Sequence, residues 1–202
     1  VFENDVRSLL RQTVADAKAA GVTFAFAAEM EFYLFRLDEA GNPTREPFDH
    51  AGYMDVAPDD RCENVRREIC LNLQDMGIQP ESSHHEEGPG QNEIDFRYSD
   101  ALSAADNAMH FKTVVKTAAL RNGLYADFSP KPMEHEAGNG MHINMSLFKD
   151  GKNAFFDPDA PGQLSPLAYQ FIAGLLAHVQ GFCALTNPLV NSYKRLVPGY
   201  EA

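Results

Sequence analysis

One short stretch, residues 83–95, concentrates the side chains that could do chemistry. It holds two histidines, four carboxylates and a Gly-Pro-Gly triplet at 88–90. Glycine supplies positive φ and proline fixes its own φ, so this triplet predicts a tight turn between two strands. Glu86 precedes the turn and Glu93 follows it, so a hairpin would bring these two carboxylates face to face. Facing carboxylates repel each other, and a cation between them is the usual remedy.

Two further strands are expected to present metal-binding groups on a polar face. Residues 22–37 alternate in polarity with period two, which places Glu29 and Glu31 on one face, about 7 Å apart. The strand that follows Gly140 does the same for His142. A single polar strand face is normally just hydrated, and a lone acidic hairpin is usually a solvated loop. Three such strands, each with an apolar opposite face, indicate one cavity lined by carboxylates and an imidazole.

The ligand types favour hard cations. Carboxylate-rich sites with few nitrogens select Mg²⁺ or Mn²⁺ over Zn²⁺. Paired ions bridged by phosphate oxygens are used in phosphoryl transfer. The sequence contains no GxxxxGK[ST] loop, so a nucleotide would be held by another arrangement.

Helical patterns flank these strands. We expect helices over residues 5–20, from a cap at Asp59 or Asp60 to about Met76, from a cap at Ser99 or Asp100 to Gly123, and from Ser165 to Pro188. The last should bury Leu167, Phe171, Ile172, Leu175, Leu176 and Val179. A strand at 124–128 and a hairpin turn at 150–151 are also expected, with residues 43–58 irregular and 191–202 a loop. Strands beside long amphipathic helices predict an α+β fold: an antiparallel sheet with a polar, metal-lined face and amphipathic helices packed behind it.

Composition narrows the classes of function. With 202 residues, 44% of them apolar, the chain can bury a full core. The net charge of −12 argues against nucleic acid and anionic membranes as partners. No apolar run approaches membrane-spanning length and no signal peptide opens the sequence. Cys62, Cys70 and Cys183 have no metal-ligand spacing, which predicts free thiols in a reducing cytoplasm.

The whole chain resembles the catalytic domain of type I glutamine synthetase. The matching motifs, in the order of that family, are Glu29-Met30-Glu31-Phe32-Tyr33-Leu34-Phe35, Gly52-Tyr53-Met54-Asp55, His84-His85-Glu86 with Gly90-Gln91-Asn92-Glu93-Ile94-Asp95, Lys131-Pro132, Gly140-Met141-His142 and residues 191–202. The hairpin and the closing twelve residues are the most specific of these.

The resemblance implies two metal sites, ATP as co-substrate and a set of substrate contacts. The first metal would be held by Glu31, Glu86 and Glu93, and the second by Glu29, His142 and a later glutamate. The positions that match nucleotide contacts are Glu81, Phe96, Arg97, Tyr98, Asn144 and Ser146. Gly138 matches a backbone contact to glutamate, and Arg195 matches the arginine that clamps its carboxylate. Glu201 matches the flexible-loop glutamate that shields the intermediate and takes a proton from ammonium.

The implied activity is ATP-dependent carboxylate–amine ligation, most directly glutamine formation from glutamate and ammonia through a γ-glutamyl phosphate. Ala137 and Asn144 stand where the family usually has asparagine and histidine, which keeps open a γ-glutamyl-amine synthetase acting on a polyamine or similar amine. A third alternative is an assembly protein that keeps the fold without turnover. The intact metal carboxylates, Arg195 and Glu201 argue against it.

The resemblance also implies that residues 1–202 are part of a catalytic domain. The amino-terminal β-grasp domain and the carboxy-terminal part of the catalytic domain would be absent, so we expect no glutamine formation by this polypeptide alone. The full-length parent would be a cytoplasmic, ring-shaped homo-oligomer. His84, His85, His135 and His178 are expected to be structural or surface groups.

Overall fold

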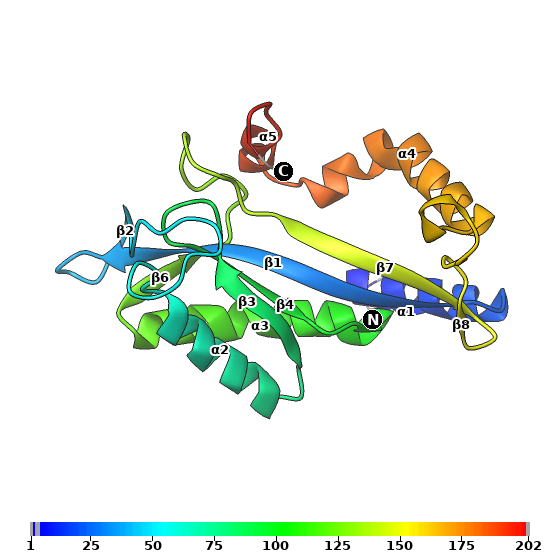
Figure 1. Cartoon of the computed structure of the whole chain (residues 1–202), viewed down its shortest axis with the longest axis horizontal. Helices are drawn as coiled ribbons and strands as arrows, with labels where there is room; N and C mark the ends of the chain where they lie inside the picture. Colours follow the sequence, from blue (N-terminus) through cyan, green and yellow to red (C-terminus); the bar gives the residue numbers. More distant parts are fainter. Residues whose placement is uncertain (1, 3–4, 201–202) are drawn as a thin grey trace. The chain divides into compact units, whose positions relative to one another are not determined.

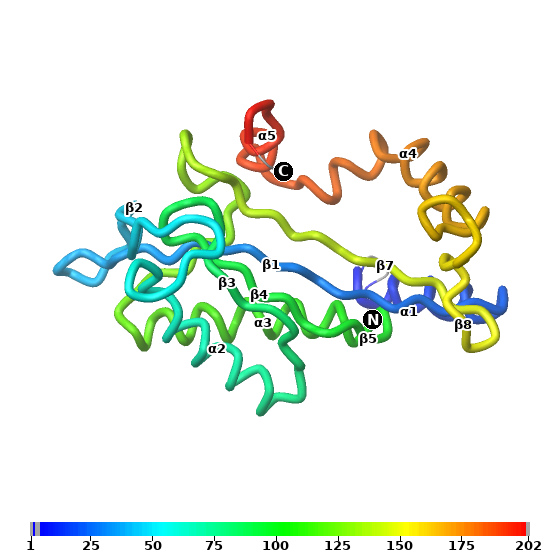
Figure 2. The backbone as a smooth tube through the Cα atoms, in the orientation of Figure 1, coloured from blue at the N-terminus to red at the C-terminus, as the bar shows by residue number. Residues whose placement is uncertain are grey.

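A computed structural model describes residues 2 and 5–200, and the backbone path can be followed in Figures 1 and 2. The elements in chain order are α1 (Val6–Ala19), β1 (Thr23–Leu37), β2 (Pro43–Pro47), α2 (Glu63–Asp75), β3 (Pro80–His85), β4 (Gln91–Phe96), β5 (Ser99–Asp100), α3 (Ala101–Arg121), β6 (Leu124–Asp127), β7 (Met141–Lys149), β8 (Lys152–Asn153), the 3₁₀ helix η1 (Pro161–Gln163), α4 (Pro166–Thr186) and α5 (Val190–Arg195). They fall into two compact units. The first unit comprises residues 1–27, 98–106 and 144–188, and the second comprises 28–97, 107–143 and 189–202.

The second unit is organised around β1. This strand pairs antiparallel with β2, β4 and β6, and β3 pairs with β4 as the other arm of the hairpin. The turn between β3 and β4 needs glycine, because Gly90 has φ +69° and a Cβ there would lie 2.9 Å from the Leu34 carbonyl oxygen. The predicted hairpin is therefore confirmed.

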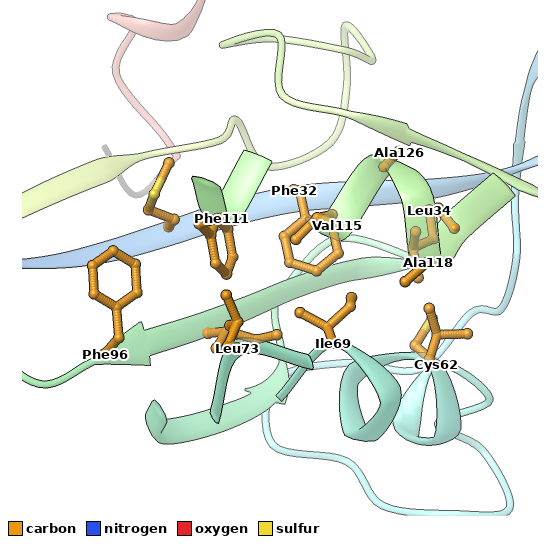
Figure 3. Packing of buried hydrophobic residues seen from close by; sticks show 14 of the residues in the cluster. Phe32, Leu34, Cys62, Ile69, Leu73, Phe96, Phe111, Val115, Ala118 and Ala126 are labelled. Atoms are coloured by element: carbon orange, nitrogen blue, oxygen red, sulfur yellow. The ribbon is translucent and has the colours of Figure 1, made fainter. Parts of the chain in front are cut away.

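The core of the second unit lies on one face of β1 and β4, against α2 and the later turns of α3. Figure 3 shows side chains of α2, such as Ile69, pointing toward aromatic rings from the strands and α3. Phe111 on α3 lies 6.1 Å from Phe32 and 5.7 Å from Phe96 between ring centroids, within the range of favourable aromatic pairs. Every second residue of β1 from Ala28 to Leu34 enters this core, which confirms the predicted α+β layering and leaves the residues between them for the other face.

Helix capping follows the sequence in one case and departs from it in another. Asp100 Oδ1 accepts hydrogen bonds from the backbone N–H groups of Leu102 and Ser103, both at 3.1 Å, as expected for the start of α3. Helix α2 begins only at Glu63, and its N-cap residue makes no side-chain cap. Asp60, one of the two expected caps, accepts a hydrogen bond from the Cys62 N–H at 2.9 Å, before the first residue of the helix. It also accepts two from the Arg66 guanidinium at 3.2 and 2.5 Å.

The first unit contains α1, β5 paired with the start of β1, the β7–β8 hairpin and α4. Asp150 and Gly151 both have positive φ, 51° and 75°, as the Asp-Gly turn predicts. Ser165 caps α4 by accepting a hydrogen bond from the Ala168 N–H at 3.2 Å. Ion pairing between Arg7 and Asp106 (2.7 Å) joins α1 to the start of α3.

The apolar face of α4 was expected to be buried, and this was wrong for five of its six residues. Phe171 is partly buried, with its ring centroid 5.9 Å from that of Phe24 and 5.1 Å from that of Phe155. Leu167, Ile172, Leu175, Leu176 and Val179 are exposed, because no element in the described part of the chain covers them. By length and composition alone this 21-residue helix could cross a membrane, contrary to the expectation from the sequence. One such helix is weak evidence of a membrane protein.

Two segments expected to lack regular structure contain short elements. Residues 43–47 form β2 beside the end of β1, within the stretch expected to be irregular. Residues 190–195 form α5 instead of a loop, and the Leu189 N–H donates to Ser192 Oγ at 3.2 Å at its start. On β7 the predicted apolar face is largely exposed at Met141, Ile143 and Met145. The three cysteines are free thiols, as expected.

Candidate functional site

The second unit contains a cavity of about 550 Å³ bordered by the polar residues of β1 and β4. Six carboxylates, two imidazoles and one guanidinium line it. The five predicted metal ligands, Glu29, Glu31, Glu86, Glu93 and His142, are all among the lining residues, as are Gly138 and Arg195. The structure thus brings together side chains from β1, the β3–β4 hairpin, the start of β7 and α5.

Strand register sets the carboxylates of β1 and β4 against each other. Glu31 is the direct partner of Glu93, and Glu29 is the direct partner of Asp95. Because Met30 between them is buried in the core, the two glutamates of β1 occupy the opposite face, as the alternation predicts.

The hairpin adds Glu86 and an unexpected histidine. Glu86 follows β3, and its N–H donates to the Gln91 carbonyl oxygen at 2.9 Å. On the other side of β4, the direct partner of Glu93 is His84 of β3. His84 was expected to be a structural or surface residue. Ligand atoms of His84, Glu86 and Glu93 all lie within 4.8 Å of one another. The signal for His84 was present in the sequence, since it lies two residues before Glu86 on an alternating strand.

The carboxylates of this cavity are electrostatically strained. Burial, side-chain hydrogen bonding with Glu86 and Asp95, and neighbouring negative charge raise the pKa of Glu93 to about 10. Burial also raises the pKa of Glu31, and the charge of Glu86 adds to this effect. Among the described residues, Asp95 Oδ1 is buried without a hydrogen-bond partner. Buried carboxylates left in this state are the donor set that a divalent cation requires.

A second pairing lies at the start of β7. His142 Nδ1 is 3.3 Å from Glu29 Oε2, and both side chains are only partly buried. The two predicted ligands of the second metal are therefore adjacent. They could share an oxygen-preferring cation, since a neutral imidazole nitrogen and a carboxylate oxygen are compatible ligands for Mn²⁺.

A glycine-rich loop, residues 138–140, closes one side of the cavity. The Gly140 N–H donates to Glu31 Oε2 at 2.9 Å. A Cβ at Gly140 would lie 2.8 Å from Glu31 Oε1 and 3.1 Å from both Arg195 Nη2 and His142 Nε2. Only glycine permits this close approach of the backbone to three polar side chains.

Gln91, which was not among the residues predicted to form the site, ties this loop to the hairpin. Its side-chain amide donates to Glu31 Oε2 at 3.0 Å, to the Gly138 carbonyl oxygen at 2.9 Å and to Asn139 Oδ1 at 3.2 Å. Gln91 therefore fixes one oxygen of Glu31, and it leaves the other free to take a ligand.

Residues 3–202 match the family model of the glutamine synthetase catalytic domain. The chain belongs to the glutamine synthetase catalytic-domain family. It is 58% identical over 201 residues to the glutamine synthetase of Clostridium saccharobutylicum, covering 100% of this chain and 45% of that protein.

Solved structures agree with this assignment. A Plasmodium falciparum glutamine synthetase superposes with a TM-score of 0.85 at 31% identity, covering 96% of this chain and 44% of that one. A GmaS/ADP complex superposes with a TM-score of 0.85 at 38% identity, covering 95% of this chain and 45% of that one. The chain therefore spans less than half the length of each of these three proteins.

The residues of this chain that were expected to contact a nucleotide do not line the cavity. Glu81 is exposed on β3, and Arg97 is exposed just after β4, where its N–H donates to the Gln79 carbonyl oxygen at 2.8 Å. Phe96 is buried against Phe111, so its side chain cannot contact a nucleotide and any contact would come from its backbone. Tyr98, Asn144 and Ser146 belong to the first unit. Glu201 lies outside the described residues. His135 and His178 are exposed, as expected.

Proposed function

We propose that this chain is the metal- and substrate-holding part of an ATP-dependent carboxylate–amine ligase. The leading activity is glutamine formation from glutamate and ammonia. The observation that carries the proposal is the meeting of Glu31, Glu86 and Glu93 in one cavity, in a chain that belongs to the glutamine synthetase family. Membership of the family alone would also be compatible with an inactive relative. In an inactive relative, however, nothing would offset the cost of placing these carboxylates close together.

Two divalent cations, Mg²⁺ or Mn²⁺, fit the donor set. Glu31, Glu86 and Glu93 would hold the first, and Glu29 and His142 would contribute to the second. When bound, such ions neutralise the negative charge that develops on phosphate and acyl oxygens. ATP is the proposed co-substrate, and the similar GmaS/ADP complex supports nucleotide binding by this fold.

The chain's own residues would bind and orient the substrate. Arg195 lines the cavity, and its guanidinium can form paired hydrogen bonds with the carboxylate of glutamate. The backbone of Gly138 would add a contact to the same substrate. The side-chain carboxylate of glutamate is a poor acyl donor, so phosphorylation by ATP precedes displacement of phosphate by the amine. Glu201 would accept the proton of ammonium and shield the acyl phosphate from water.

A γ-glutamyl-amine synthetase is the second candidate. Ala137, which stands where the family usually has asparagine, lines the cavity. A methyl group there leaves more space and one hydrogen-bonding group fewer than asparagine would. Acceptor screening in a protein of the relatives' length separates the two activities, since a γ-glutamyl-amine synthetase would turn over a larger amine faster than ammonium.

We further propose that the longer protein is a cytoplasmic, ring-shaped homo-oligomer and that this chain does not form glutamine alone. The chain spans 45% of the Clostridium relative, which supports a need for further segments. ATP-dependent amide formation by the isolated chain would refute this part of the proposal.

Calorimetric titration of this chain with Mn²⁺ tests the metal site directly. We expect saturable micromolar binding, weakened at least tenfold in Glu31→Ala. Glu39→Ala is the matched control, because Glu39 is an exposed glutamate in the turn after β1. Equal affinity in Glu31→Ala and Glu39→Ala would contradict the ligand assignment.

A further inference from the structure

A second cluster of titratable groups lies in the second unit, outside the cavity lining. Asp49, Asp60, Cys62 and His85 are all buried, and their ligand-type atoms lie within 4.8 Å of one another. Such a set could hold a transition metal, but each of these groups already has a partner within the protein. The cluster therefore needs another explanation.

Asp49 is the centre of this cluster and accepts four hydrogen bonds. Its Oδ1 receives them from His85 Nε2 at 2.9 Å and from the Gly90 N–H at 3.0 Å. Its Oδ2 receives them from the Arg61 N–H at 2.8 Å and from Cys62 Sγ at 3.3 Å. One carboxylate thus joins three separate segments of the backbone.

His85 has an acceptor beside each ring nitrogen. Its Nε2 lies 2.9 Å from Asp49 Oδ1, and its Nδ1 lies 2.6 Å from the Glu86 carbonyl oxygen. The Arg66 guanidinium pairs with Asp60 at 2.5 Å. These contacts hold the His85 ring and both aspartate carboxylates in fixed positions.

This network reaches the hairpin that carries the metal ligands at three residues. His85 immediately precedes Glu86, and Asp49 holds the turn through the Gly90 N–H. Arg66 Nη1 donates to Asn92 Oδ1 at 2.6 Å, and the Asn92 amide donates to the Gly90 carbonyl oxygen at 2.9 Å. The fixed atoms therefore lie directly beside Glu86 in the chain and directly before Glu93.

We infer that Asp49 and His85 form a positioning pair that holds Glu86 and Glu93 at metal-binding distance before the ion arrives. The inference rests on the metal site proposed above. Carboxylates must be ionised to bind a metal, and ionised neighbours repel each other, so the hairpin backbone must hold them close together. Groups that hold metal ligands in place typically contribute 10- to 100-fold in metal affinity.

Asp49→Asn is the direct test, with Mn²⁺ affinity measured by calorimetry on this chain. The substitution keeps the shape of the side chain, but it replaces one of the two accepting oxygens with an NH₂ group, which faces hydrogen-bond donors and cannot accept from them. We expect Mn²⁺ to bind at least tenfold more weakly. His85→Gln, which keeps an amide donor, is the second variant and should weaken binding in the same direction.

Controls of equal stability separate positioning from general loosening of the fold. Ile69→Val and Leu73→Ala change core residues of α2. The control is whichever of these two variants has a melting temperature that matches that of Asp49→Asn, and it should bind Mn²⁺ as tightly as wild type. Equal loss of affinity in that control would overturn the inference. Wild-type Mn²⁺ affinity in both Asp49→Asn and His85→Gln would also overturn it. Unfolding of both variants at 10 °C would overturn it too, because the pair would then be required for folding only. Failure of the wild type itself to bind Mn²⁺ would overturn the proposed metal site, and the inference with it.

Discussion

Glu31 on β1 and Glu93 on β4 are direct partners across two antiparallel strands. Like charges at directly opposite positions destabilise a sheet, and water screens this pair only weakly because Glu93 is buried and Glu31 is partly buried. The pair is tolerated only if a proton or a cation removes the repulsion. Burial is the main cause that raises the pKa of each residue in the metal-free protein, and the charge of Glu31 adds to the shift of Glu93.

Metal binding is predicted to release a proton. The pKa of Glu93 is raised to about 10 by burial, Glu86 and Asp95, so its carboxyl keeps its proton at pH 7.5. A metal ligand must be deprotonated, so we expect release of close to one proton per Mn²⁺. Calorimetry in buffers of different ionisation enthalpy measures this number. Binding without proton release would show that Glu93 is already ionised or is not a ligand.

Stability of the metal-free protein should fall as the pH rises. The carboxyl of Glu93 ionises near 4.5 when unfolded but keeps its proton to about pH 10 when folded. The unfolded state therefore binds fewer protons over this range, and the free energy of unfolding declines from about pH 4.5 to about pH 10.

Glu93→Gln isolates this contribution, because the amide cannot ionise. The variant should melt at the same temperature as wild type at pH 4 and several degrees higher at pH 9. For a chain of this size, a gain of about 1 kcal/mol in the free energy of unfolding raises the melting temperature by roughly 2–4 °C. Differential scanning calorimetry without metal makes the comparison. A lower melting temperature for the variant at pH 9 would contradict the raised pKa.

Gly140→Ala should damage the site while leaving most of the fold intact. The added Cβ would lie 2.8 Å from Glu31 Oε1, so the glutamate or the loop must move. We expect Mn²⁺ affinity to fall at least tenfold. Gly174→Ala on α4 is the control, since a Cβ there meets nothing within 4 Å and alanine favours a helix by roughly 0.4–1 kcal/mol. Wild-type affinity in Gly140→Ala would show that the close approach is not needed.

The neighbouring arginines of α2 should differ sharply in their contribution to stability. Arg66 and Asp60 form an ion pair with side chains only 5% and 2% exposed, and Arg66→Met leaves a buried carboxylate unpaired, at a cost of about 3–5 kcal/mol. Arg67 pairs with Glu63 at the surface, so Arg67→Met should cost less than about 0.5 kcal/mol. Urea unfolding of the two variants provides the test. Similar losses would mean that water reaches the Asp60 site.

Local patterns were sufficient to predict the parts of the site that depend on backbone geometry. A strand alternates with period two whatever it packs against, so Glu29 and Glu31 could be placed opposite the core. The Gly-Pro-Gly triplet similarly predicted the hairpin that brings Glu86 and Glu93 within reach of each other. The α+β layering followed from apolar residues spaced for strands and helices.

Tertiary structure alone decided which residues meet across the chain. The pairing of Glu31 with Glu93, the link from Gln91 to Glu31 across 60 residues and the bond from Asp49 to His85 across 36 residues depend on register and packing, which no local pattern encodes. The exposed face of α4 has the same origin. An amphipathic sequence determines which side of a helix is apolar, but burial of that side depends on whether another element packs against it.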